Sequence, residues 1–159
     1  MAATYQWSES NGSGETVTDG ITNMNFGDND SPNLVTTTYP IVAGNNSYEK
    51  YIRAKFSSSF TEISNMKFWM SVGTYLAGED IKAAANQAYV QPVKTTSTVA
   101  TVTVPTGVGS ALSIQAADGS GTIVAPGYTK YFVLQEQTTG STPAGAVNTK
   151  TFTFQYDEI

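Results

Sequence analysis

Two closely spaced carboxylates, Asp28 and Asp30, stand in the polar segment 27–33, where Asn, Ser and Pro surround them. Calcium takes roughly six to eight oxygen ligands, and a loop of this kind can supply some of them. The glycine and glutamate offsets of the EF-hand loop are absent, however, and Asx side chains in such loops commonly bond to nearby backbone groups. The segment therefore predicts an Asx-rich turn, and we expect no metal and no cofactor.

Chemistry that depends on His or Cys is excluded, because the chain contains neither residue. A Ser-His-Asp triad, a Cys nucleophile and a Cys-based zinc site are therefore impossible. A pair of carboxyl groups could still hydrolyse a glycosidic bond. Most of the 13 acidic residues fall in predicted turns or at the C-terminus, and only Glu62 and Glu136 lie close to predicted strands. We expect solvated surface carboxylates and no enzymatic activity.

Three aromatic residues are candidates for contact with a partner: Trp7, Tyr51 and Trp69. Tyr51 and Trp69 occupy the polar phase of their alternating segments, so their rings could point out of the sheet. Exposed rings stack on sugars or anchor a protein partner. The alternative is that both faces of these strands are covered, which would place the rings in the core.

Composition and charge limit the classes of partner. Charged residues make up only 13% of the 159 residues, the net charge is −5, and the eight basic residues do not cluster. A phosphate backbone is recognised by several Lys and Arg side chains on one face, so we expect no nucleic-acid partner. No apolar run approaches the length of a membrane span, and no basic-then-apolar secretory signal opens the chain. We expect one domain, 1–159, synthesised in the cytoplasm.

The elements that must position these residues are strands. Alternation of apolar and polar residues with period two marks a half-buried strand. Such alternation occurs at 4–8, 21–26, 51–56, 66–72, 100–104, 131–135 and 151–156. An eighth strand is expected at 81–88 or at 111–116, although the acidic start and Ala run of 79–86 also fit a short helical turn. Gly-rich turns separate the runs, which predicts an all-β fold: a single antiparallel β-sandwich, Ig-like or jelly-roll-like, with seven to eight main strands.

The inward phase of these strands predicts the core. The residues expected to be buried are Phe56, Phe68, Phe132, Leu134, Phe152 and Phe154. The segment 105–127 is long and rich in Gly, Ala and Ser, and long loops in compact domains are usually functional or mobile.

Several segments resemble small virion proteins of tailed bacteriophages. They are Ser31–Leu34, Ile63–Trp69, Tyr128–Gln135 and Lys150–Glu158. The likeness is closest to the β-sandwich proteins that decorate or cement phage heads. The resemblance implies a structural protein on the capsid exterior of the virion, bound to the major capsid protein and stabilising the shell. It also implies contact with neighbouring copies, in the form of a trimer, and no catalytic residues.

Contacts in such an assembly are expected to use the N-terminal segment 1–5 and the loop 105–127, because the strand faces are needed for the core. The alternative function is a carbohydrate-binding or adhesin module of a phage tail, fibre or receptor-binding protein. Outward aromatic side chains aligned on one sheet would favour that alternative.

Overall fold

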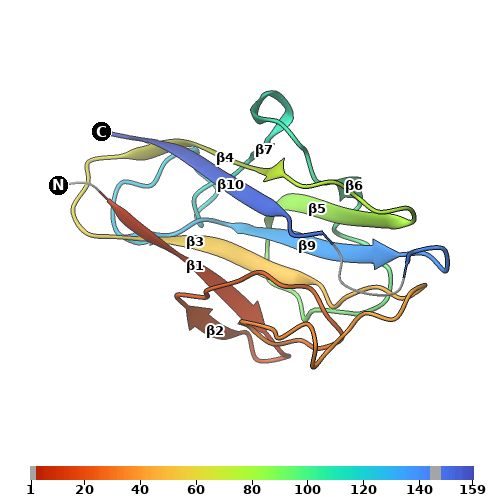
Figure 1. Cartoon of the computed structure of the whole chain (residues 1–159). Coiled ribbons are helices and arrows are strands. Elements are labelled where there is room, and N and C mark those ends of the chain that lie inside the picture. The colour runs from red at the N-terminus through yellow and green to blue at the C-terminus, as the bar shows by residue number, and fades with distance from the viewer. Residues whose placement is uncertain (1–2, 144–147) are drawn as a thin grey trace.

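The computed structural model describes residues 3–143 and 148–159, which form two antiparallel sheets packed face to face (Figure 1). The predicted all-β sandwich is confirmed. In the described part of the chain the helical structure is limited to one 3-10 turn, η1 (Val108–Ser110). No helix in these two ranges is long and apolar enough to cross a membrane.

The larger sheet has seven strands in the order β2-β1-β3-β9-β5-β6, with β8 paired to one end of β3. Its strands are β1 (Thr4–Asn11), β2 (Thr16–Asp19), β3 (Lys50–Ser57), β5 (Glu79–Gln87), β6 (Val102–Thr103), β8 (Gly127–Tyr128) and β9 (Tyr131–Thr138). The smaller sheet has the order β10-β4-β7. Its strands are β4 (Ile63–Val72), β7 (Leu112–Ser113) and β10 (Thr151–Glu158).

The space between the sheets is filled largely by aromatic rings. Phe68 of β4 stacks on Phe132 of β9 with ring centroids 4.2 Å apart, and Trp7 of β1 meets Phe132 edge-on at 5.5 Å. The predicted burial of Phe56, Phe68, Phe132 and Leu134 is confirmed, since each is at most 1% exposed. The two remaining predicted core residues, Phe152 and Phe154, are only half-buried. Both belong to β10, an edge strand with a neighbour on one side.

Some expected strands differ from the observed ones. The segment 79–87 is a strand, β5, because it pairs along β9, so the helical alternative is wrong. At 111–116 and 100–104 only the two-residue strands β7 and β6 form. The expected strand at 21–26 is wrong. That segment is part of a long loop, in which Thr22 donates its backbone N–H to Asn33 Oδ1 at 2.6 Å.

The outer face of the larger sheet is also covered. The segment between β5 and β6, residues 88–101, packs Tyr89, Val99 and Ala100 against Tyr51, Tyr131 and Val133. Tyr51 and Tyr131 are therefore buried on the side of the sheet that points away from the sandwich core. This covering segment decides the outcome for one of the three candidate contact residues.

Candidate functional site

Tyr51 and Trp7 do not present their rings to a partner. Tyr51 is 0% exposed beneath residues 88–101, with its ring 5.2 Å from that of Tyr89. Burial raises the pKa of its hydroxyl to about 12, so it stays neutral at physiological pH. Trp7 is half-buried and points into the space between the sheets, where it meets Phe68, Phe132 and Phe154. The expectation that these two residues contact a partner is corrected, because the sheet faces that carry them are covered.

Trp69 lies on the outer face of the smaller sheet. Phe68 and Met70, the residues on either side of Trp69 in β4, are buried and point inward. Side chains alternate along a strand, so Trp69 points outward. We define the small-sheet face as Lys67, Trp69, Ser71, Thr153 and Gln155, which come from the paired strands β4 and β10. Thr153 lies directly across from Trp69 and donates to Ser71 Oγ at 2.7 Å. The face is polar apart from one half-buried aromatic ring, that of Trp69.

The open edge of the smaller sheet is formed by β10. The other sheet edges end in strands of four residues (β2) and two residues (β6 and β7), whereas β10 has eight. Short edge strands are a common protection against unwanted pairing with another chain. β10 contains neither Pro nor Lys, but it ends in Asp157 and Glu158 and its register with β4 shifts at two points. It is the longest edge strand among the described residues, so it offers the most backbone groups to a further strand.

The loop 105–127 is bound to the sandwich at several points. Pro105 accepts a hydrogen bond from the backbone of Met70 at 2.8 Å, and Ile63 and Ile123 form a bridge between their backbones. Ile114 and Ile123 are buried in the core. Much of this expected contact loop is thus part of the fold. In the other expected contact segment, 1–5, the first two residues lie outside the described residues.

Asp28 and Asp30 are used in long-range contacts rather than in a local Asx turn. Asp28 pairs with Lys94 at 2.6 Å. Asp30 accepts hydrogen bonds from the Asn11 side chain at 2.6 Å and from the Gly12 backbone at 2.8 Å. The described residues contain no group of three or more acidic side chains suited to a metal ion.

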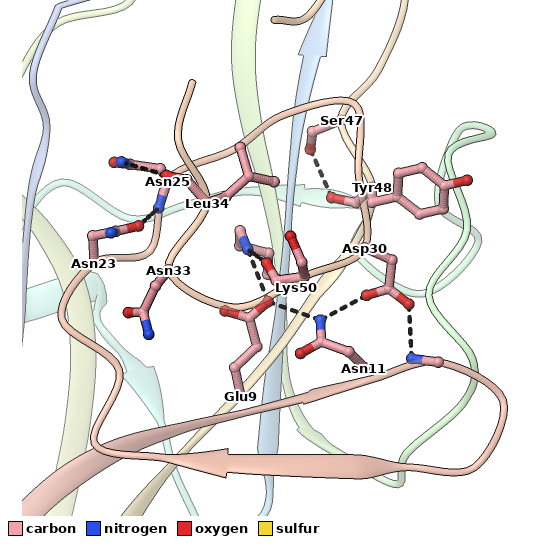
Figure 2. Close-up of polar contacts among 12 residues, drawn as sticks. Glu9, Asn11, Asn23, Asn25, Asp30, Asn33, Leu34, Ser47, Tyr48 and Lys50 are labelled. Atoms are coloured by element: carbon pink, nitrogen blue, oxygen red, sulfur yellow. Dashed lines mark hydrogen bonds and ion pairs between the residues drawn. The ribbon is translucent and has the colours of Figure 1, made fainter. Parts of the chain in front are cut away.

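A buried polar centre joins β1, β3 and the loop that follows β2 (Figure 2). We call Glu9, Asn11, Asp30 and Lys50 the Glu9 centre. Glu9 Oε1 accepts from Lys50 Nζ at 2.8 Å and from Asn11 Nδ2 at 3.0 Å. The side chains of Glu9 and Lys50 are 0% and 3% exposed. Burial raises the pKa of Glu9 despite the opposing effect of Lys50, so its neutral form is favoured more than in water.

A second buried centre joins Glu79 of β5, Glu136 of β9 and Lys150, which precedes β10. We call it the Glu136 centre. Lys150 pairs with Glu79, whose other oxygen accepts from the backbone of Leu76 at 2.8 Å. Burial, and then repulsion from Glu79, raise the pKa of Glu136 to about 7. Glu79 and Glu136 are only 6% and 3% exposed, so both carboxyl groups lie inside the fold.

Glu136→Gln should therefore remove part of the pH dependence of stability. Because the folded pKa of Glu136 lies above its ordinary value of 4.5, its stabilising effect is complete below that value and is lost as the pH rises through about 7. The loss is of the order of 3 kcal/mol. We expect denaturant unfolding to show a smaller fall in stability between pH 4.5 and 8 for Glu136→Gln than for the native chain. Glu62→Gln, beside the C-terminus, is the control and should keep the native slope. A native slope in Glu136→Gln would contradict the assignment.

A third group of buried polar side chains fixes residues 88–101 to the sheet. Gln135 is 0% exposed and accepts from the Ser97 backbone at 2.8 Å, while its amide donates to the Thr95 carbonyl at 2.8 Å. The hydroxyl of Ser97 donates to Glu49 Oε1 at 2.5 Å. These contacts hold the covering segment in place without apolar burial along its whole length.

Sequence reasoning missed most of these polar centres. Phe132 and Leu134 point inward, and alternation places Glu136 on the same side of β9. Glu9 likewise comes two residues after Trp7 and shares its side of β1. Both positions were interpreted as surface charge, because nothing in a single sequence identifies Lys50 or Lys150 as the nearby cation.

Comparisons with known proteins gave no relative: no family model, no curated protein and no solved structure matches the chain.

Proposed function

We propose that the chain is a structural protein of a phage virion that binds the outer surface of the major capsid shell and stabilises it. One observation carries the proposal: the small-sheet face and the open edge of the smaller sheet are adjacent, because β10 contributes to both. The resemblance of the four segments to head decoration proteins supports the same function. Many weak contacts made by repeated copies on a shell add up to stable binding.

The chemistry of the small-sheet face suits a wide, hydrated interface. Hydroxyl and amide groups of Ser71, Thr153 and Gln155 exchange hydrogen bonds with water for bonds with a partner at little cost. Lys67 is the one cation of this face, so little charge must be desolvated. The Trp69 ring supplies an apolar anchor of the kind that commonly dominates binding energy.

The β10 edge offers a second mode of contact. A strand or extended arm of a neighbouring subunit could pair with its free backbone groups and extend the smaller sheet. Such pairing depends on backbone hydrogen bonds rather than on charge. It would connect one copy to another or to the capsid protein.

The carbohydrate-binding alternative has one observation in its favour, the half-exposed Trp69 ring. A sugar-binding platform normally aligns several rings, and Trp7 and Tyr51 do not join Trp69 on its face. We therefore place this function second.

We expect mass spectrometry of purified virions of the phage that encodes the chain to find it in many copies. Purified chain should also rebind to capsids from which it has been removed. Binding should persist well above physiological ionic strength, where the screening length is already about 8 Å. Trp69→Ala should weaken binding about tenfold or more, an effect typical of a central aromatic contact.

Val42→Ala is the matched control, because Val42 is 62% exposed on the long loop after β2 and away from the small-sheet face. It should bind as the native chain does. The proposal would be contradicted by the absence of the chain from virions, or by binding that disappears at moderate salt. Binding to a glycan array with loss in Trp69→Ala would support the carbohydrate alternative instead.

A further inference from the structure

The Glu9 centre brings an amine and a carboxamide to the same buried carboxyl oxygen. Lys50 Nζ and Asn11 Nδ2 both donate to Glu9 Oε1, at 2.8 Å and 3.0 Å. Glu9 and Asn11 stand two residues apart on β1 and so share one face of the strand. Continuing the antiparallel register beyond Ser10↔Tyr51 places Lys50 opposite Asn11 on the neighbouring strand. The three side chains therefore converge because of the β1–β3 register and not because of a flexible loop.

Two oxygens in this centre have no partner among the described residues: Glu9 Oε2 and Asn11 Oδ1. Both are buried, and an unsatisfied buried polar atom is costly. A neutral Glu9 reduces this cost at Oε2, because a buried protonated oxygen is less unfavourable than a buried charged one. The raised pKa of Glu9 agrees with this state.

We propose that Lys50 and Asn11 form an intramolecular amide bond, with Glu9 as the acid and base that transfers the protons. Lys50 first passes a proton to Glu9, which leaves a neutral amine and a neutral acid. The amine lone pair attacks Cγ of Asn11, and the carbonyl electron pair moves onto Oδ1 until Nδ2 leaves. Glu9 then carries the surplus proton of the attacking nitrogen to Nδ2. The Cγ–Nδ2 bond breaks, ammonia leaves, and Glu9 remains neutral.

The surroundings favour this reaction over hydrolysis. The side chains of Glu9 and Lys50 are 0% and 3% exposed, and Asn11 is 7% exposed, so little water reaches them. Asp30 accepts from Asn11 Nδ2 at 2.6 Å and thereby fixes which end of the carboxamide faces Glu9. The two nitrogens are at most about 6 Å apart by way of the shared oxygen. The flexible stem of Lys50 can cover the remaining distance by changing rotamer.

The intact mass of the purified chain tests the bond directly. The amide should lower the mass by about 17 Da, the mass of one ammonia, below the value calculated from the sequence. A bond from Lys50 to a carboxyl group, such as that of Asp30 or Glu9, would release water instead, about 18 Da. The measurement uses the native chain alone, so it depends neither on a variant that must fold nor on a capsid partner.

Digestion then locates the bond. Cleavage after glutamate divides the chain at Glu9, Glu15, Glu49 and Glu62. Peptides 10–15 and 50–62 should be recovered as one branched species joined between Asn11 and Lys50. Glu9→Gln keeps the shape of the centre but cannot transfer protons, and Lys50→Arg keeps the positive charge but does not act as the amine. Both variants should show the full mass. Lys82→Arg, in the partly exposed pair with Asp80, is the matched control and should keep the loss.

Three results would overturn the proposal. One is a native chain with the full calculated mass. Another is a loss of about 18 Da, which would mean a carboxyl partner. The third is a loss of about 17 Da with peptides 10–15 and 50–62 recovered separately. That last pattern would indicate a succinimide at Asn11-Gly12, which also releases ammonia.

Discussion

Phe132→Ala should lower the free energy of unfolding by about 3–5 kcal/mol, the range for truncating a buried Phe. Phe132 is 0% exposed on the central strand β9, stacks on Phe68 and meets Trp7 edge-on. Its removal leaves a cavity between two sheets whose backbones are fixed by their pairing, so collapse around the gap is limited. Chemical denaturation followed by Trp fluorescence measures the loss, because Trp7 lies in the same cluster.

Phe152→Ala is the matched comparison for Phe132→Ala. Phe152 also stacks on Phe68, with centroids 5.4 Å apart, but it is half-buried on the edge strand β10. Less apolar surface returns to water, and the site is already open to solvent, so the loss should be clearly smaller. Equal losses in the two variants would show that the sandwich core is not centred on the β4–β9 contact.

Before the proposed amide bond forms, Lys50 and Glu9 are a buried ion pair, and Lys50→Met should destabilise that form of the chain by about 3–5 kcal/mol at neutral pH, as is typical when one partner of such a pair is removed. The methionine fills much of the same space but leaves Glu9 buried without its cation. Glu9 then becomes harder to ionise, so its folded pKa lies still further above its ordinary value. An acid whose pKa is raised in the folded state stabilises the fold fully below its unfolded pKa. This stabilisation is lost as the pH rises through the folded pKa. The destabilisation should accordingly be larger at pH 8 than at pH 4.5.

The control for Lys50→Met is Lys94→Met, which breaks the pair with Asp28 at the surface, where the side chains are 35% and 38% exposed. Exposed pairs typically contribute about 0–1 kcal/mol. Denaturant titrations of both variants at two pH values give the comparison. A loss for Lys50→Met no greater than that for Lys94→Met would mean that the Glu9 centre does not hold β1 against β3.

In the proposed virion assembly, the two buried centres would also support the contact surface. The Glu9 centre lies under the loop after β2, and the Glu136 centre attaches the start of β10 to β5 and β9. β10 carries two of the five residues of the small-sheet face, Thr153 and Gln155, so the Lys150–Glu79 pair helps to hold that part of the face in place. The proposed binding to a capsid depends on a surface with a fixed shape, and these anchors would help to provide one.

The local pattern of the sequence determined the strands that form the centre of the sandwich. Alternation in β3, β4 and β9 identified Phe56, Phe68 and Phe132 as inward residues, because period-two alternation is dictated by the pleat and holds wherever one face is buried. The same reasoning failed at 21–26, where the alternation is weak and the backbone is held by the Asn33 side chain instead of a neighbouring strand. It also missed β2, whose Thr-rich residues carry little apolar signal.

Only the tertiary structure decided what covers each face. Tyr51 and Trp69 occupy equivalent outward phases, yet Tyr51 is sealed beneath residues 88–101 whereas Trp69 stays half-exposed. Likewise, Glu9 and Lys50 stand 41 residues apart and meet at 2.8 Å only because β1 pairs with β3. Alternation fixes which side chains share a face, since it is a property of one strand. The covering segment and the opposing charge come from distant parts of the chain, and their placement depends on strand pairing that no local pattern records.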